Sequence, residues 1–144
     1  MKHRESTLKK LEGVIPSACI VYTDETCRTL DEDATRKQFR YLLQHDIGAL
    51  VVGGHAGEFE CLDPEERKRV IQMAKEEAKG KVPIVGGVAG DSTREAIKKG
   101  LEAKKAGADA VLFCPPTIIG YDRETGGNFY VEHYAKVDQE VDPT

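Results

Sequence analysis

A glycine-rich loop contains the residues of this sequence that are best suited to chemistry. The apolar run Ala49–Val52 leads into Gly53–Glu58, which reads Gly-Gly-His-Ala-Gly-Glu. A helix is predicted soon afterwards, because Asp63 can cap it, Pro64 suits its first position and acidic residues follow. Backbone N–H groups between a strand and a helix bind small anions in α/β proteins. We therefore expect an anion-binding site made of Gly54, His55, Ala56, Gly57 and Glu58.

These residues also have simpler explanations. The glycines can form nothing more than a tight turn, and Glu58 is better explained as a carboxylate that hydrogen-bonds the loop than as an acid or base. His55 and Glu58 are two possible metal ligands without a third, so no metal is expected. The run Gly86–Gly90 resembles a dinucleotide fingerprint, but no acidic residue follows a second strand at the required distance. We therefore predict no cofactor.

The composition limits the fold class and the partners. The 144 residues are 40% apolar and 32% charged, which fits one globular domain. A net charge of -4 without a basic stripe argues against nucleic acid as a partner. No apolar run approaches the roughly 20 residues that span a bilayer, and no signal peptide is evident, so we predict a cytoplasmic protein without membrane contact.

Single cysteines and histidines give little indication of a site. The cysteines at positions 19, 27, 61 and 114 form no paired motif, so we expect them to be reduced. Cys19 and Cys114 are predicted to lie in strands as small apolar side chains. His3, His45 and His133 are predicted to be surface residues.

Short apolar segments alternate with amphipathic helices along the chain. Strands are predicted at residues 14–21, 49–52, 82–85 and 110–114. Helices are predicted at residues 31–45, 64–79, from the cap at Ser92 to Ala106, and at 129–137. Capping boxes at Thr29-x-x-Glu32 and Ser92-x-x-Glu95 are expected to begin two of these helices.

This alternation predicts an α/β fold with parallel strands joined by right-handed crossovers. About four βα units are predicted, and residues 1–144 form one domain. A complete (β/α)8 barrel needs roughly 250 residues, so the chain fits the first half of one. A small open doubly wound sheet is the alternative, and periodicity does not choose between them.

Five motifs, in order and correctly spaced from about residue 12 to 137, resemble the N-terminal half of the dihydrodipicolinate synthase and N-acetylneuraminate lyase family. They are the loop 53–58, Leu62-Asp63-Pro64-Glu65-Glu66-Arg67, the strand 82–88, Ser92-Thr93-Arg94-Glu95-Ala96-Ile97, and 106–112 with Pro115-Pro116. The resemblance implies an aldolase-type (β/α)8 barrel, usually tetrameric. It also implies a lyase that condenses or cleaves pyruvate-like 2-oxo acids through a Schiff base on a lysine, without a cofactor.

The departures from the family pattern affect the implied site. His55 and Ala56 stand where many members have two hydroxyl residues, so backbone N–H groups must bind the 2-oxo acid carboxylate. The family's proton-relay tyrosine corresponds to Pro116-Thr117. We therefore assign the catalytic roles to His55, as a proton-transfer group, and Thr117, and expect an aldolase, hydratase-aldolase or dehydratase rather than the synthase itself.

The lysines predict an incomplete site. All of those from Lys37 onward fall on or beside predicted helices, and the family's Schiff-base lysine belongs to a later strand, which would begin after Thr144. The first hypothesis is therefore a lyase-family chain that lacks this lysine. The second is a non-catalytic truncated half-barrel that forms a homo-oligomer or pairs with a separate C-terminal half. The third is a truncated product without a stable fold.

Overall fold

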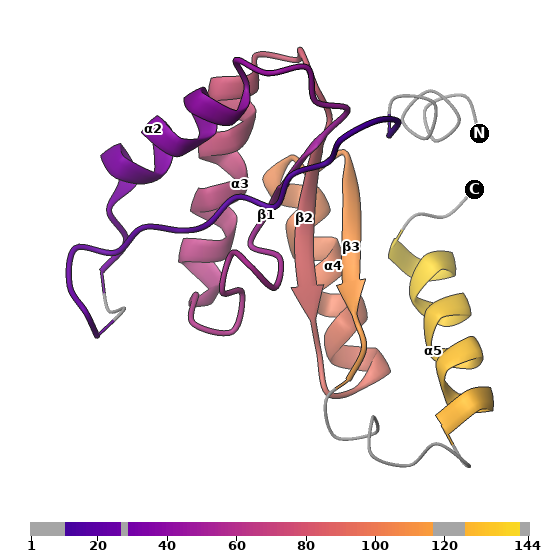
Figure 1. Ribbon diagram of the computed structural model, residues 1–144. Helices are drawn as coiled ribbons and strands as arrows, with labels where there is room; N and C mark the ends of the chain where they lie inside the picture. Colours follow the sequence, from indigo (N-terminus) through magenta and orange to yellow (C-terminus); the bar gives the residue numbers. More distant parts are fainter. Residues whose placement is uncertain (1–10, 27–28, 117–125, 142–144) are drawn as a thin grey trace.

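Three parallel strands form the centre of the molecule (Figure 1). The computed structural model describes residues 11–26, 29–116 and 126–141. The strands are β1 (Leu50–Val52), β2 (Ile84–Ala89) and β3 (Ala110–Cys114), and β2 lies between the other two. Val85 is the partner of Val51 in β1 and of Ala110 in β3. The predicted α/β class with parallel βα repeats is confirmed.

Helices α2 (Glu32–Leu42), α3 (Pro64–Ala78), α4 (Thr93–Ala106) and α5 (Gly126–Val141) alternate with the strands. Asp63 caps α3 in a complete capping box with Glu66, as the sequence predicts for an Asp-Pro start. The cap predicted at Thr29 is wrong, because the Asp31 carboxylate accepts the N–H of Ala34 and takes that role.

Three other helix predictions need correction. Ser92 caps α4 by accepting the N–H of Glu95, but the Glu95 carboxylate accepts the N–H of Asp91, so the box is not reciprocal. The last helix is longer than the predicted 129–137, since α5 covers residues 126–141. The helix predicted at 31–45 ends at Leu42, where Leu43 forms the C-cap.

The strand predicted at residues 14–21 does not form as a regular strand. Ser17 makes one parallel bridge to Val51, and Tyr22 makes an antiparallel bridge to Leu30. Pro16 explains part of this, because it has no N–H to donate to a ladder. The described chain therefore contains a three-stranded sheet with one bridged segment instead of four complete βα units.

One face of the sheet is covered by helices. Leu50, Val52, Ile84 and Val88 point to the face against which α3 and α4 pack, and each is at most 3% exposed. Met73 of α3 is completely buried there. The opposite face holds a small cluster of Val51, Val85 and Ala49, with Leu11 packed against it. We call these the outer and the inner face.

Strand β2 continues beyond the predicted end at Val85 through two glycines. A Cβ at Gly87 would lie 2.1 Å from the carbonyl oxygen of Gly53, so only glycine fits at this close approach of β2 to the end of β1. Gly86 faces the outer side, where Ile71 and Ala103 leave little room. The two glycines of β2 are therefore sites of close packing. From the sequence alone, a glycine pair fits a loop as well as a strand.

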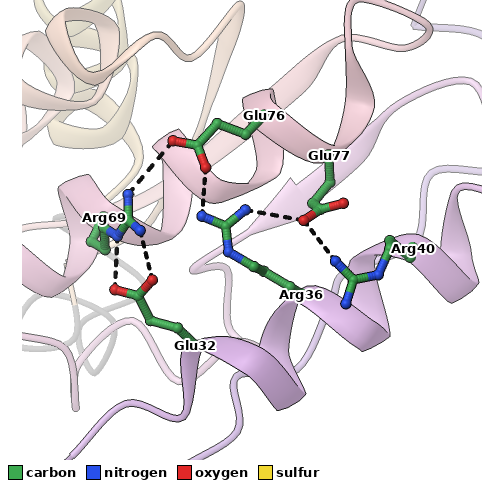
Figure 2. A network of polar contacts seen from close by, with 6 residues as sticks. All are labelled: Glu32, Arg36, Arg40, Arg69, Glu76 and Glu77. Carbon is green, nitrogen blue, oxygen red and sulfur yellow. Dashed lines mark hydrogen bonds and ion pairs between the residues drawn. The ribbon is translucent and has the colours of Figure 1, made fainter.

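A network of ion pairs joins α2 to α3 (Figure 2). Arg69 of α3 binds both oxygens of Glu32, at 2.6 and 2.7 Å. Arg36 of α2 binds Glu76 and Glu77, and Arg40 also binds Glu77 at 2.8 Å. The hydrogen bond from Arg69 lowers the pKa of Glu32. Such a network fixes the position of α2 on α3, which an isolated surface pair does weakly.

A carboxylate connects three elements at the amino ends of the strands. Asp109, just before β3, accepts the N–H of Ile84 at 2.8 Å and both of its oxygens bind Lys75 Nζ of α3, at 2.9 and 3.0 Å. The backbone N–H of Asp109 donates to the carbonyl of Ile84 at 2.8 Å. We call this arrangement the Asp109 clamp.

Replacement of Asp109 by alanine is expected to lower the free energy of unfolding by about 2 kcal/mol, because the N–H of buried Ile84 and the Lys75 ammonium lose a charged acceptor. Urea unfolding followed by circular dichroism measures this. Asp46→Ala, at an exposed position, is the control and should change the value by less than about 0.5 kcal/mol. Equal effects of the two substitutions would contradict the clamp.

His133 packs α5 against α4. The prediction of a surface residue is wrong, since the side chain is 2% exposed and stacks on Phe129. Its Nδ1 lies 3.0 Å from the hydroxyl of Thr93, while its buried Nε2 has no hydrogen-bond partner in the described part of the chain. Burial lowers the pKa of His133.

Stability should therefore fall as the medium becomes acidic. A histidine whose pKa is lower in the folded state favours folding above its unfolded value of about 6.5 and disfavours it progressively below that value. The melting temperature of the chain is expected to drop between about pH 7.5 and pH 5.5, and His133→Phe should flatten this slope. His45→Phe, at an exposed ring, should leave the slope unchanged. Identical slopes for both variants would overturn the assignment.

Candidate functional site

The loop 53–58 lies at the carboxyl end of β1 and is held by its own turns. The N–H groups of Gly57 and Phe59 donate to the carbonyl of Gly54, at 3.0 and 3.4 Å. The N–H of Glu58 donates to the carbonyl of His55 at 3.1 Å. These bonds fold the loop back on itself, so its shape is fixed before any ligand binds.

Two neighbouring donors remain at the tip of this loop. Among the described residues, none accepts a hydrogen bond from the N–H of His55 or of Ala56. Both residues are exposed, whereas Gly54 and Gly57 on either side are buried. Adjacent free N–H groups form an anion-binding geometry. The arrangement suits a carboxylate.

The loop glycines are required by close packing. A Cβ at Gly57 would lie 2.9 Å from the carbonyl oxygen of Ala18 and 2.9 Å from the nitrogen of Gly53. A Cβ at Gly54 would lie 3.0 Å from a Val51 methyl group. Gly53 itself has a φ of 59°, which glycine adopts without strain. The tight-turn explanation of these glycines is thus sound, and the turn is also what leaves the two N–H groups free.

Glu58 has an unusual backbone conformation. Its φ is 52°, in the left-handed region that a side chain rarely adopts. The residue is exposed, and no described residue pairs with its carboxylate. Retained strain of this kind is common in ligand-binding loops, where the surrounding turn imposes it.

The predicted catalytic residues are not brought together within the described structure. The His55 ring is exposed and packs against Phe59, with ring centroids 6.2 Å apart. Thr117, like Tyr121, lies outside the described residues. Across the described ranges, no group of three potential metal ligands occurs. No helix in this part of the chain is long and apolar enough to cross a membrane.

A cavity of about 250 Å³ lies next to the loop, between α3 and α4 and beside the end of β2. Apolar side chains such as Phe59 and Ile71 contribute to its wall, together with charged ones from both helices. Lys99 binds Glu95 at 2.7 Å and lowers the pKa of that carboxyl group. The sequence did not indicate this cavity, because its wall combines residues from three separate segments with no motif in common.

No lysine of the described structure belongs to a strand. β1, β2 and β3 contain none. Lys75 is bound in the Asp109 clamp, at the end of the sheet opposite the loop, and Lys104 donates to the carbonyl of Asp109 at 3.4 Å. No described lysine therefore extends from a strand toward the loop.

Two cysteine side chains are more exposed than the sequence predicts. Cys19 is exposed instead of buried, and Cys114 is half-buried. Burial, followed by the charge of Glu60, raises the pKa of the Cys114 thiol. Both cysteines belong to the inner side of the sheet, where cover is thin.

Comparison with known proteins gives a consistent result. Residues 10–140 match the model of the Dihydrodipicolinate synthetase family. A 4-hydroxy-tetrahydrodipicolinate synthase from Methanopyrus kandleri is 32% identical over 92% of this chain and 43% of its own length. An uncharacterized DapA-like lyase from Halobacterium salinarum is 33% identical over 92% of this chain and 41% of its own length. The chain thus spans less than half the length of these relatives.

Solved structures agree with this comparison. The dihydrodipicolinate synthase of Acinetobacter baumannii, in complex with pyruvate, superposes with a TM-score of 0.78 at 29% identity, covering 92% of this chain and 43% of that one. YagE from Escherichia coli K12, also in complex with pyruvate, gives a TM-score of 0.74 at 28% identity over 90% and 41%. The fold of the described chain is that of the N-terminal half of a (β/α)8 barrel.

Proposed function

Because the chain belongs to the Dihydrodipicolinate synthetase family, we propose that it is the carboxylate-binding part of a class I lyase that acts on pyruvate-like 2-oxo acids. The observation that carries the proposal is that no described residue accepts a hydrogen bond from the N–H of His55 or of Ala56, at the carboxyl end of β1. Pyruvate in the structures of two relatives supports the ligand class.

In this proposal the carboxylate of the 2-oxo acid accepts hydrogen bonds from both N–H groups. Charge-assisted bonds of this type are stronger than neutral ones, and the loop is already folded to make them. Gly54, Gly57 and Glu58 contribute through the turn, since their backbone conformations orient the donors. The side chains of His55 and Ala56 supply no hydroxyl group to the carboxylate.

His55 is proposed to transfer protons beside the bound acid. An imidazole changes protonation near neutral pH, and the exposed ring of His55 adjoins the donor pair. Thr117, which follows β3 in the sequence and lies outside the described residues, is proposed as a second catalytic group. Aldol cleavage, hydration with aldol cleavage, and dehydration all need a proton donor and acceptor at this position.

Formation of a Schiff base needs an amine in addition. A neutral lysine attacks the carbonyl carbon, a C=N bond replaces the C=O bond, and the oxygen leaves as water. We propose that this lysine is not among the described residues, because every described lysine lies outside the strands. The chain then binds the acid but does not form the covalent intermediate by itself. The proposal assigns no role to a metal or cofactor.

A second function is favoured by the open side of the sheet. Ile15 is 38% and Leu112 44% exposed, although both adjoin the sheet. Apolar side chains at an open sheet promote association. The second proposal is therefore a half-barrel that closes with another chain, either a second copy or a separate C-terminal half. A cytoplasmic location stays a prediction.

Removal of one donor tests the carboxylate site. Ala56→Pro abolishes the N–H at position 56 and is expected to weaken pyruvate binding about tenfold or more, since a hydrogen bond to a charged group is lost. Ala56→Gly retains the N–H and serves as the control. Titration followed by amide chemical shifts gives the affinities, with neutral acetone as the ligand control. Equal affinities of the two variants for pyruvate would exclude the donor pair.

Reduction with borohydride tests the absent amine. After incubation of the folded chain with pyruvate and borohydride, intact mass is expected to show no pyruvyl adduct, because none of the described strands carries a lysine. A complete relative of the same family, treated in parallel, is the positive control. A stoichiometric adduct on this chain would show that one of its own lysines forms the imine.

A further inference from the structure

The glycine-rich loop turns over the inner face of the sheet. A Cβ at Gly87, an inward-facing residue of β2, would lie 2.1 Å from the carbonyl oxygen of Gly53 and 2.5 Å from the Cα of Gly54. Methyl carbons of Val51 in β1 and Leu112 in β3 lie 3.0 and 3.9 Å from the Cβ position of Gly54. The start of the loop therefore lies against inward-facing residues of all three strands.

Ser17 adds a polar side chain to this group. It is the parallel bridge partner of Val51, and the side chains of such a pair lie on the same face of a sheet. Val51 donates to the carbonyl of Pro16 at 3.0 Å, and Ala18 donates to the carbonyl of Val51 at 2.9 Å. These two bonds fix the register, so β1 itself holds Ser17 on the inner face.

The Ser17 hydroxyl lies near the N–H of His55, for which no described residue is an acceptor. The hydroxyl oxygen is 3.1 Å from the Cβ position of Gly54. Because the next backbone nitrogen is that of His55, standard bond lengths put the hydroxyl oxygen within about 7 Å of it. A carboxylate accepts hydrogen bonds of about 2.8 Å at each of its oxygens and can join two donors at this separation.

The segment that carries Ser17 packs against the loop at a second point. A Cβ at Gly57 would lie 2.9 Å from the carbonyl oxygen of Ala18. The loop and the segment are thus in contact on both sides of the loop tip, through glycines at each point. The hydroxyl therefore has a defined place relative to the donors at the tip, and a binding site that is already arranged loses less affinity to ordering.

The hydroxyl is available to a ligand. Within the described ranges it takes part in no hydrogen bond. Its neighbours beside Gly54 are the methyl groups of Val51 and Leu112, which are not acceptors. A serine hydroxyl donates one hydrogen bond, and such a bond is stronger when the acceptor is charged.

We propose that Ser17 is a substrate-binding residue, whose hydroxyl donates a third hydrogen bond to the carboxylate of the 2-oxo acid beside the N–H groups of His55 and Ala56. The carboxylate then lies between the loop tip and the inner face, and the 2-oxo group is directed to the space in front of that face. This inference rests on the proposed function, and it adds a side chain to a site otherwise made of backbone groups.

Removal of the hydroxyl tests this contact. Ser17→Ala keeps a small side chain beside Gly54, and its pyruvate affinity is expected to fall about tenfold, because a hydrogen bond to a charged group is lost. Its melting temperature should stay within about 2 °C of the original, since no described contact is lost. Tyr41→Phe removes an exposed hydroxyl from α2 and is the matched control. Titrations followed by amide chemical shifts give the affinities.

Equal pyruvate affinities of Ser17→Ala and Tyr41→Phe would overturn the inference and leave the proposed function intact. A loss of affinity that merely accompanies a loss of folded protein, seen by circular dichroism, would also overturn it. An unaltered chain that does not bind pyruvate contradicts the proposed function, and the Ser17 contact with it.

Propionate separates the two ends of the ligand, because it has the carboxylate without the 2-oxo group. The unaltered chain is expected to bind propionate, and Ser17→Ala should weaken the binding of propionate and pyruvate by similar factors. A loss confined to pyruvate would contradict a contact with the carboxylate. So would a chain that binds pyruvate but shows no binding of propionate.

Discussion

The alternation of side chains across a parallel sheet is the constraint on which this structure depends. Every second residue of β1, β2 and β3 belongs to the outer face, and these residues meet α3 and α4 in one apolar core. Since the strands are parallel and adjacent in chain order, right-handed crossovers place α3 and α4 on the same face of the sheet. The same rule directs the remaining residues, such as Val51 and Val85, to the inner face. The position of the loop 53–58 and the apolar core are therefore consequences of one arrangement.

Much of the fold could be predicted from the sequence, because the signals were local. The start of α3 at Asp63-Pro64 combines a cap, a proline and an acidic first turn, and all three act within a few residues. The positions of β1 and β3 were also clear, since each is a short apolar run after a helix end. The loop 53–58 could be located by its place after β1, whereas its role as an anion-binding site stays a prediction.

The remaining errors share a physical cause, which is tertiary contact. Thr29 has the side chain of a cap, but its carbonyl accepts a bond from Thr23 and Asp31 takes the helix terminus. His133 looked like a surface residue because its burial depends on α4, which is distant in sequence. The end of β2 was misplaced because Gly87 is required by Gly53, a neighbour only in the folded chain. The cavity beside α4 escaped notice for the same reason.

Because of the Asp109 clamp, a single βα unit of this fold is not structurally independent. Lys75 comes from one βα unit, Ile84 begins the next, and Asp109 precedes the third. A single carboxylate therefore depends on three successive repeats being present together. Exchange of one βα unit between homologous proteins, or a circular permutation cut between α3 and β2, would separate an acceptor from its donors. Recombination in such a chain is expected to succeed when the segment from α3 to β3 moves as one block.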